Sequence, residues 1–490
     1  MNRPVVRLYA FLLLLFGLLV WKTSQWAVFD AEALQDNPKN RRPLILSQTI
    51  ERGTIKTADG VTVAESSPVN AGNTPIYVRH YPQGSLFGHP VGYSFVEVGQ
   101  SGIERAENDE LTGERNEFSS IIDQLRDVPQ AGDDVTLTID AQAQQVATQA
   151  LEQAQSVAGA NGAGAVVAIE PSTGAVKVMA SVPGYDPNAV ENSGTFQQLN
   201  AEPDAPLVNR PTQSAYPPGS TMKVVTAAAA LDSGEFTPDS VLSGRSPQLI
   251  GGVPLFNAGD EQFGDIDMTT ALTNSVNTYF AQVGERLGTD TMVEYMRRFG
   301  FYSDPEVGLP GDEMRASGPQ SSSGKLVTQG FDPGRVAIGQ GGAEGQDLTT
   351  PLQMAEVAAT VANDGVLMRP TFIQEITDPD GRTVEKLDPQ EQSTVMSEQT
   401  AAELTEMMTN VTQEGTATGL TVGGTSFAGK TGTAEIDPET GENQPWFIAF
   451  APADNPQVAV ATTVERCTGC FGAEVAGPVA TQVMESLLGG

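Results

Sequence analysis

The stretch Tyr216-Pro-Pro-Gly-Ser220-Thr-Met-Lys223-Val-Val-Thr-Ala-Ala-Ala-Ala-Leu231 decides the fold and the chemistry expected of this chain. Two prolines and a glycine interrupt the segment before Ser220, and the run that follows Lys223 is typical of a helix. Ser220 therefore stands at the start of a predicted helix over 220–231. Because residues three apart lie on one helix face, the amine of Lys223 is expected to reach the hydroxyl of Ser220.

Lys223 is the candidate base for this serine. A serine hydroxyl is a poor nucleophile until a base removes its proton. The chain has 2 histidines, His80 and His89, both in its N-terminal third, so a Ser-His-Asp site or a His-based metal site is hard to build. Lys223 can act as the base only when neutral, so burial and a second cation must lower its pKa.

A later motif, Lys430-Thr-Gly-Thr433, supplies that second cation and a predicted substrate edge. Lys430 is expected to lower the pKa of Lys223 and to contact a substrate carboxylate. Thr431, Gly432 and Thr433 are the expected substrate-binding residues, on a strand where the glycine leaves room for a substrate backbone. The backbone N–H groups of Thr433 and Ser220 would form an oxyanion hole.

The motif Ser275-Val-Asn277 lies between these two in the sequence. Ser275 is expected to relay a proton to the leaving amine, and Asn277 to hold the acyl amide of a substrate. A second Ser-x-x-Lys match, Ser322-Ser-Gly-Lys325, falls in a Ser/Gly stretch that reads as a flexible loop, where nothing fixes the lysine relative to the serine.

Composition excludes some classes of function. The chain has 490 residues, with 27 Lys+Arg against 61 Asp+Glu, for a net charge of −34. This balance argues against a nucleic-acid partner, and the acidity is typical of a solvated surface. No metal site and no cofactor are expected. The length suggests two folded domains and a membrane element.

The N-terminus carries an apolar run from Leu8 to Trp21, preceded by Arg3 and Arg7. We expect a cytoplasmic tail over 1–7 and a transmembrane anchor over 8–28, with the catalytic part of the chain outside the cytoplasm. The alternative is a cleavable signal peptide, because Ala31-Glu-Ala33 resembles a cleavage site.

The remaining chain divides into two expected domains. The β-rich pedestal domain is expected over 29–135, with a polar linker over 35–42 near its start, and the catalytic domain over 136–490. In the second domain an early hairpin, three late strands and intervening helices suggest an α+β fold with one antiparallel sheet closed by both ends of the domain. The list of expected elements is strands at 135–139, 165–169, 176–179, 426–436, 446–451 and 458–464, and helices at 140–155, 220–231, 268–287 (interrupted), 351–362 and 473–488.

The 2 cysteines form the pair Cys467-Thr-Gly-Cys470. A disulfide is the favoured interpretation for an extracytoplasmic segment, since no further ligands for zinc stand nearby. A redox-active pair and two reduced thiols are the alternatives.

Together these motifs resemble the set Ser-x-x-Lys, Ser-x-Asn and Lys-Thr-Gly of penicillin-binding proteins, with Val276 where a related set has Asp. The chain resembles a class B penicillin-binding protein of the short actinobacterial type. The residues that carry this likeness over almost the whole length are Arg52-Gly-Thr-Ile55, Tyr216-Pro-Pro-Gly-Ser220, Ala337-Ile-Gly-Gln-Gly341, Thr350-Pro-Leu-Gln353 and Trp446-Phe-Ile-Ala-Phe-Ala451.

The resemblance implies a non-catalytic pedestal and a D,D-transpeptidase domain that cross-links peptidoglycan stem peptides and is acylated by β-lactam antibiotics. It also implies a partner, a glycan polymerase of the SEDS type in the cytoplasmic membrane. The chain departs from the family at Cys467–Cys470, where many members have glycine-rich residues. The competing functions are a hydrolase (D,D-carboxypeptidase or β-lactamase) and a non-enzymatic sensor or polymerase scaffold.

Overall fold

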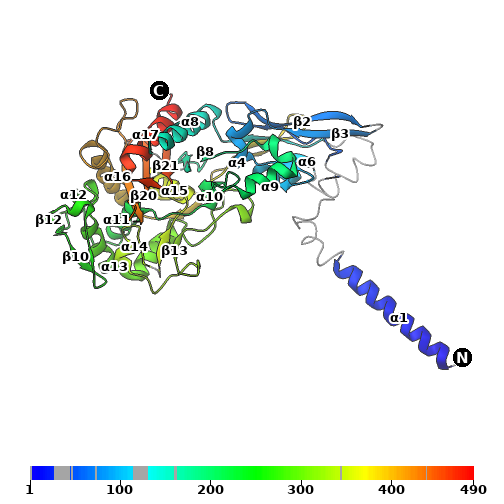
Figure 1. Ribbon diagram of the computed structural model, residues 1–490, viewed down its shortest axis with the longest axis horizontal. Helices are drawn as coiled ribbons and strands as arrows, with labels where there is room; N and C mark the ends of the chain where they lie inside the picture. The colour runs from blue at the N-terminus through cyan, green and yellow to red at the C-terminus, as the bar shows by residue number, and fades with distance from the viewer. Residues whose placement is uncertain are drawn as a thin grey trace.

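The computed structural model describes residues 3–26, 45, 48–71, 74–113, 131–158, 163–342, 345–437 and 439–489 (Figure 1). The predicted linker over 35–42 and the possible cleavage site at 31–33 lie outside the described residues. Helix α1 (Arg3–Ser24) has no buried residue and, among the described helices, is the one long and apolar enough to cross a membrane. The helix begins at Arg3, which lies inside the expected cytoplasmic tail over 1–7.

An antiparallel sheet forms the centre of the larger body. Its strands run in the order β19 (Ala428–Asp437), β20 (Glu442–Ala451), β21 (Val458–Val464), β7 (Gly164–Ile169) and β8 (Val176–Val182). Every neighbouring pair is antiparallel, and the short β22 (Cys467–Thr468) also pairs with β20. Early and late strands thus close one sheet, which confirms the predicted α+β class.

Helices cover this sheet on both faces (Figure 1). On one face α17 (Gly472–Leu487) packs on β20 and β21, beside α8 (Ala141–Ala158). On the other face α15 (Pro351–Ala362) packs on β20, β21 and β7. Residues 446–451 of β20 are fully buried between the two layers, so the central strand is apolar on both sides.

A helical subdomain lies against the β19 edge. The predicted helix over 220–231 begins as a 3₁₀ turn, η4 (Gly219–Thr221), and continues as α11 (Met222–Asp232). The predicted interrupted helix is α12 (Met268–Thr273) followed by α13 (Asn277–Arg298). Helix α11 is buried almost throughout because it packs against α13 and α16 (Glu398–Gln413).

A second sheet spans the pedestal, in the order β17 (Thr383–Lys386), β16 (Ile373–Thr377), β6 (Asp134–Leu137), β1 (Ile55–Lys56), β2 (Thr62–Ala71) and β3 (Thr74–His80). Strands β16 and β17 come from the chain after α15, far beyond residue 135. These two strands were not predicted from the sequence, because a short strand carries no local signal of a partner far away in the chain. The sheet therefore contains strands from both sides of the proposed domain boundary at 135.

Shorter elements connect these layers. They are η2 (Gly84–Phe87), α4 (Gly88–Val91), β4 (Ser94–Phe95), β5 (Gly99–Gln100), α5 (Gly102–Ala106), α6 (Asn108–Thr112), η3 (Pro187–Glu191), α9 (Ser193–Ala201), α10 (Arg210–Gln213), β9 (Leu242–Ser243), β10 (Gln248–Ile250), β11 (Val253–Leu255), η5 (Ala258–Asp260), β12 (Asp265–Ile266), η6 (Gly311–Glu313), β13 (Gly318–Gln320), α14 (Pro333–Val336), β14 (Gln346–Leu348), β15 (Val366–Met368) and β18 (Glu391–Thr394).

Candidate active site

The candidate nucleophile Ser220 sits in the middle of the 3₁₀ turn η4. Gly219 has a φ of 53° there, and its N–H donates to the carbonyl oxygen of Gly339 at 3.1 Å. A β carbon on Gly339 would lie 2.0 Å from the carbonyl oxygen of Gly219, so these two backbones pack in direct contact. On the other side, Trp446 Nε1 donates to the carbonyl oxygen of Pro217 at 2.9 Å. The turn is therefore fixed by backbone contacts from both sides.

Lys223 Nζ lies 3.0 Å from Ser220 Oγ, as the three-residue spacing predicted. The same nitrogen lies 2.6 Å from the carbonyl oxygen of Ser275, 3.2 Å from Ser275 Oγ and 2.7 Å from Asn277 Oδ1. The side chain of Lys223 is fully buried. The structure thus brings the first two motifs together around one amine.

Both lysines of the site have lowered pKa values. Burial lowers the pKa of Lys223 well below its ordinary value, and the positive charge of Lys430 lowers it further. Burial also lowers the pKa of Lys430, to about 7. Lys430 Nζ donates to Ser275 Oγ at 2.9 Å and to the carbonyl oxygen of Thr431 at 3.1 Å. A neutral Lys223 beside a protonated Lys430 is the charge state that a lysine base requires.

Ser275 occupies the tight connection between α12 and α13, with a φ of 58°. This left-handed conformation turns the chain sharply before Asn277 opens α13. Asn277 Nδ2 donates to the carbonyl oxygen of Phe256 at 3.1 Å. A residue not anticipated from the sequence, Asn257, holds the start of α13, since its Oδ1 accepts from the backbone N–H and the hydroxyl of Thr278. A lone asparagine in a loop gives no signal of this role.

Strand β19, at the edge of the sheet, carries the motif Lys430-Thr-Gly-Thr433. Its glycine also has a packing reason that the sequence did not predict. A β carbon on Gly432 would lie 2.9 Å from each of Pro218 O, Thr221 Cγ2 and Trp446 Cβ, so the glycine makes room for the turn that carries Ser220.

Two threonines flank Gly432 on this strand. Thr431 Oγ1 lies 2.6 Å from Thr416 Oγ1. Thr433 Oγ1 accepts from the backbone N–H of Gly472 at 3.3 Å. The side chain of Thr433 is therefore held by the first residue of α17.

The three motifs line one cleft of about 650 Å³. Its walls include Ser220, Ser275, Asn277, Thr431 and Thr433. Ser322 is exposed in a turn and does not line this cleft. A second hollow of similar volume, at the C-terminal end of α13, contains none of the motif residues. Across the described residues, no group of three or more His, Cys, Asp or Glu side chains could hold a metal ion.

The two histidines lie away from the cleft. His80 ends β3 and His89 is in α4, both on the pedestal side. Burial lowers the pKa of His89 to about 4, and its Nε2 lies 2.8 Å from the carbonyl oxygen of Pro206. Neither side chain lines the cleft.

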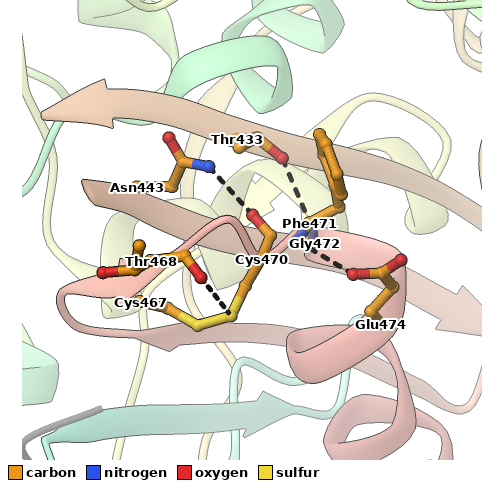
Figure 2. The surroundings of a disulfide bond; sticks show 8 residues. All are labelled: Thr433, Asn443, Cys467, Thr468, Cys470, Phe471, Gly472 and Glu474. Atoms are coloured by element: carbon orange, nitrogen blue, oxygen red, sulfur yellow. Dashed lines mark hydrogen bonds between the residues drawn. A yellow bond between two sulfur atoms is a disulfide. The ribbon is translucent and has the colours of Figure 1, made fainter. Parts of the chain in front are cut away.

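Cys467 and Cys470 are joined by a disulfide beside the cleft (Figure 2). Residues that follow the second cysteine, Phe471 and Gly472, line the cleft together with Asn443 of β20. The family resemblance already implied that this pair lies at the edge of the active site, after the last strand of the sheet, and the structure has it there.

This sheet, with a serine–lysine pair at the start of a helix beside it and Lys-Thr-Gly on its edge strand, defines the class of active-site-serine proteins that includes penicillin-binding proteins and class A β-lactamases. Two family models match: the penicillin binding protein transpeptidase domain over residues 164–485 and the penicillin binding protein A dimerisation domain over 52–135. The chain belongs to the penicillin-binding protein transpeptidase family.

Three named relatives match most or all of the chain. It is 34% identical over 482 residues to the peptidoglycan D,D-transpeptidase PbpA of Mycolicibacterium smegmatis, covering 95% of this chain and 94% of that protein. It is also 34% identical to PbpA of Mycobacterium tuberculosis, with 100% of both chains covered. Stage V sporulation protein D of Bacillus subtilis is 30% identical, over 89% of this chain and 66% of that protein.

Solved structures agree with the fold. The ceftriaxone acyl-enzyme complex of penicillin-binding protein A from M. tuberculosis matches with a TM-score of 0.80 and 31% identity, covering 91% of this chain and 100% of that one. The D,D-transpeptidase domain of a peptidoglycan glycosyltransferase from Eggerthella lenta matches with a TM-score of 0.75 and 33% identity, covering 90% and 99%.

Proposed function

We propose that this protein is a peptidoglycan D,D-transpeptidase that cross-links stem peptides through an acyl-enzyme on Ser220. The observation that carries the proposal is the buried amine of Lys223, 3.0 Å from Ser220 Oγ and next to a second buried lysine. The family relatives named peptidoglycan D,D-transpeptidases support the same activity.

In the proposed first step, Ser220 Oγ attacks the carbonyl carbon of the donor peptide bond, and Lys223 takes the hydroxyl proton. The backbone N–H groups of Ser220 and Thr433 stabilise the negative charge on the carbonyl oxygen. The C–N bond then breaks. Its nitrogen receives a proton through Ser275, whose hydroxyl lies between the two lysine amines. The products are an ester on Ser220 and a free D-alanine.

In the proposed second step, the amine of an acceptor peptide attacks the ester carbonyl. A new amide bond forms, the ester bond breaks, and Ser220 recovers its proton through Lys223. Asn277 holds the acyl amide, and Thr431, Gly432 and Thr433 bind the donor backbone along β19. A β-lactam enters by the first step, but its leaving amine stays tethered, so the ester persists. No cofactor takes part.

We also propose that α1 anchors the protein in the cytoplasmic membrane, with 1–7 inside and the catalytic domain outside. The positive residues before the apolar run, Arg3 and Arg7, support this orientation. The assigned segments are the anchor over 8–28, the pedestal over 29–135 and the transpeptidase domain over 136–490. A SEDS-type glycan polymerase in the same membrane is the proposed partner.

Mass spectrometry tests the enzymatic proposal. Purified protein is incubated with a labelled penicillin, and separately with a pentapeptide donor and an amine acceptor. We expect one penicilloyl group on Ser220, a cross-linked product, and neither with Ser220→Ala. Ser322→Ala is the matched control and should be labelled like the wild type. Release of the donor acyl group to water alone would instead identify a hydrolase, and label at Ser322 would refute the assignment of the nucleophile.

A further inference from the structure

The disulfide between Cys467 and Cys470 closes a short loop that is tied to a wall of the cleft. Cys467 pairs with Asn443 across the β22–β20 ladder. Asn443 Nδ2 also donates to the carbonyl oxygen of Cys470 at 3.1 Å (Figure 2). Because Asn443 lines the cleft, both cysteines are connected to the same cleft-lining residue, Cys467 through the backbone of Asn443 and Cys470 through the side chain of Asn443.

The segment that follows this loop contacts β19, the strand that carries Lys430-Thr-Gly-Thr433. The backbone N–H of Gly472 donates to Thr433 Oγ1 at 3.3 Å (Figure 2). A β carbon on Gly472 would lie 2.2 Å from the carbonyl oxygen of Trp446 and 2.5 Å from that of Gly432, so its backbone packs directly on β19 and β20. A shift of this segment therefore shifts Thr433, whose N–H belongs to the proposed oxyanion hole.

The chain that enters the loop contacts the segment before the nucleophile. Glu465 Oε1 accepts from Arg210 Nε at 2.8 Å and from the hydroxyl of Tyr216. Tyr216 stands directly before the two prolines that lead to Ser220, and its ring meets that of Trp446 edge to face. Before the loop, Glu465 contacts Tyr216 in the segment that leads to Ser220. After the loop, Gly472 contacts Thr433 of β19.

We propose that this disulfide positions the oxyanion hole. When closed, it holds Gly472 against Thr433 and keeps the N–H of Thr433 directed at the reacting carbonyl. When open, the loop keeps only non-covalent contacts, namely its hydrogen bonds and the packing of Gly472, and Thr433 loses part of its support. The redox state of Cys467 and Cys470 then sets the rate at which Ser220 is acylated. This inference rests on the proposed function and adds a form of regulation to it.

Opening the bond is a two-electron reduction. A dithiol reductant supplies two electrons and two protons, Cys467 and Cys470 become thiols, and the dithiol becomes a disulfide. Cys467 is fully buried and Cys470 is 9% exposed, so reduction of the folded protein is expected to be slow. A variant without sulfur therefore gives the sharper comparison.

The experiment compares the full-length wild type, oxidised and dithiol-treated, with Cys467→Ala/Cys470→Ala and with Thr468→Ala. Thr468→Ala is the matched control, because its side chain is exposed on the same loop and the disulfide is kept. Alkylation followed by mass spectrometry verifies the thiol state. A fluorescent penicillin gives two readouts: the second-order rate constant of acylation and the final amount of label per protein.

We expect the double variant and the reduced wild type to be acylated about fivefold more slowly, the factor that one hydrogen bond of ordinary strength represents. Their final labelling should equal that of the oxidised wild type, the double variant should not respond to dithiol, and Thr468→Ala should match the wild type. Equal rate constants in all samples would overturn the inference. So would reduced final labelling with an unchanged rate constant, because the disulfide would then only stabilise the fold. Missing label on the oxidised wild type would instead contradict the proposed function itself.

Discussion

Lys223 and Lys430 approach the same hydroxyl from two sides. Ser275 Oγ lies 3.2 Å from Lys223 Nζ and 2.9 Å from Lys430 Nζ, and both lysine side chains are fully buried. Two ammonium groups that both contact one buried hydroxyl repel each other strongly, because little water screens them. The two lysines therefore favour a state in which only one of them is protonated. Lys430, with a pKa of about 7, holds that charge more readily than Lys223, whose pKa is lowered by burial and by Lys430.

We predict that Lys223→Ala and Lys430→Ala each reduce the rate constant of penicillin acylation at least about 100-fold. The first removes the base; the second removes a contact to the substrate carboxylate and a charge that lowers the pKa of Lys223. The matched control is Lys325→Ala, which removes the lysine of the second Ser-x-x-Lys match, on an exposed turn. Near-normal acylation by Lys223→Ala from about pH 6 to 9 would contradict its assignment as the base.

The pH dependence should be bell-shaped. Lys223 must be neutral, so acylation rises as the pH passes upward through its lowered pKa. Lys430 must be charged to bind a carboxylate, so acylation falls as the pH rises through about 7. In Lys430→Ala the alkaline limb should vanish, and the acid limb should move to higher pH because the pKa of Lys223 loses a neighbouring cation. Profiles of acylation rate against pH check this, and an acid limb that stays in place would disprove the coupling of the two lysines.

The sequence predicted the local parts of the site better than the long-range parts. Pro351–Ala362 forms the helix expected for 351–362, and Lys223 reaches Ser220, because both depend on spacing along one helix. The left-handed φ of Ser275 and the contact of Glu465 with Tyr216 were not predicted. The first depends on how α12 meets α13, and the second joins residues 249 positions apart. Neither leaves a periodic pattern in the sequence.

Asp347 of β14 carries a carboxyl group in the protein interior. Its side chain is fully buried, and neither carboxyl oxygen has a hydrogen-bond partner among the described residues. Burial raises its pKa to about 8. The folded state therefore keeps this proton up to about pH 8, while the unfolded chain loses it above about pH 4, so folding stability falls as the pH rises between them.

We predict that Asp347→Asn removes this loss of stability. Relative to the wild type, its free energy of unfolding should improve by on the order of 1 kcal/mol for each pH unit between about pH 5 and pH 8. Urea unfolding at several pH values measures this difference. Asp304→Asn, on an exposed residue, is the matched control. A parallel pH dependence in Asp347→Asn and the wild type would show that Asp347 is ionised in the folded protein.

The pedestal contains a buried cluster of charged side chains, and loss of one of them should lower the free energy of unfolding. Glu104 Oε2 lies 2.6 Å from Arg52 Nε, and Glu104 Oε1 lies 2.6 Å from Arg79 Nε. Burial alone would raise the pKa of Glu104, but the two arginines together lower it. Glu104→Ala leaves two buried cations unpaired, so we predict a loss of about 3–5 kcal/mol in the free energy of unfolding.

An exposed pair in the same region is the control for that loss. Arg105 NH1 lies 2.7 Å from Asp312 Oδ1, which is 63% exposed. Asp312→Ala should change the free energy of unfolding by less than about 1 kcal/mol. Denaturant unfolding of both variants gives the comparison, and similar losses in the two would contradict the importance of burial.

The last prediction concerns α1 and the proposed polymerase partner. A cross-linking enzyme acts on polymer emerging at the membrane, so tethering raises its effective concentration there. A tether needs only apolar length, and α1 has it, with no residue buried. Gly17 has no side chain beyond a hydrogen atom, so a second helix could approach α1 closely at this position. We therefore predict that α1 stays attached and also contacts the polymerase.

Two measurements separate the anchor from the contact. N-terminal sequencing of membrane-extracted protein should find the native start, and a start near residue 34 would show signal cleavage and end the anchor hypothesis. Replacing residues 5–21 by an unrelated spanning helix should then preserve penicillin binding but weaken co-purification with the co-expressed SEDS-type polymerase. Gly17→Leu should weaken it too, whereas Leu15→Ala, nearly opposite on the helix, should not. Unchanged co-purification with the replaced helix would mean that the pedestal makes the contact and that α1 is a tether only.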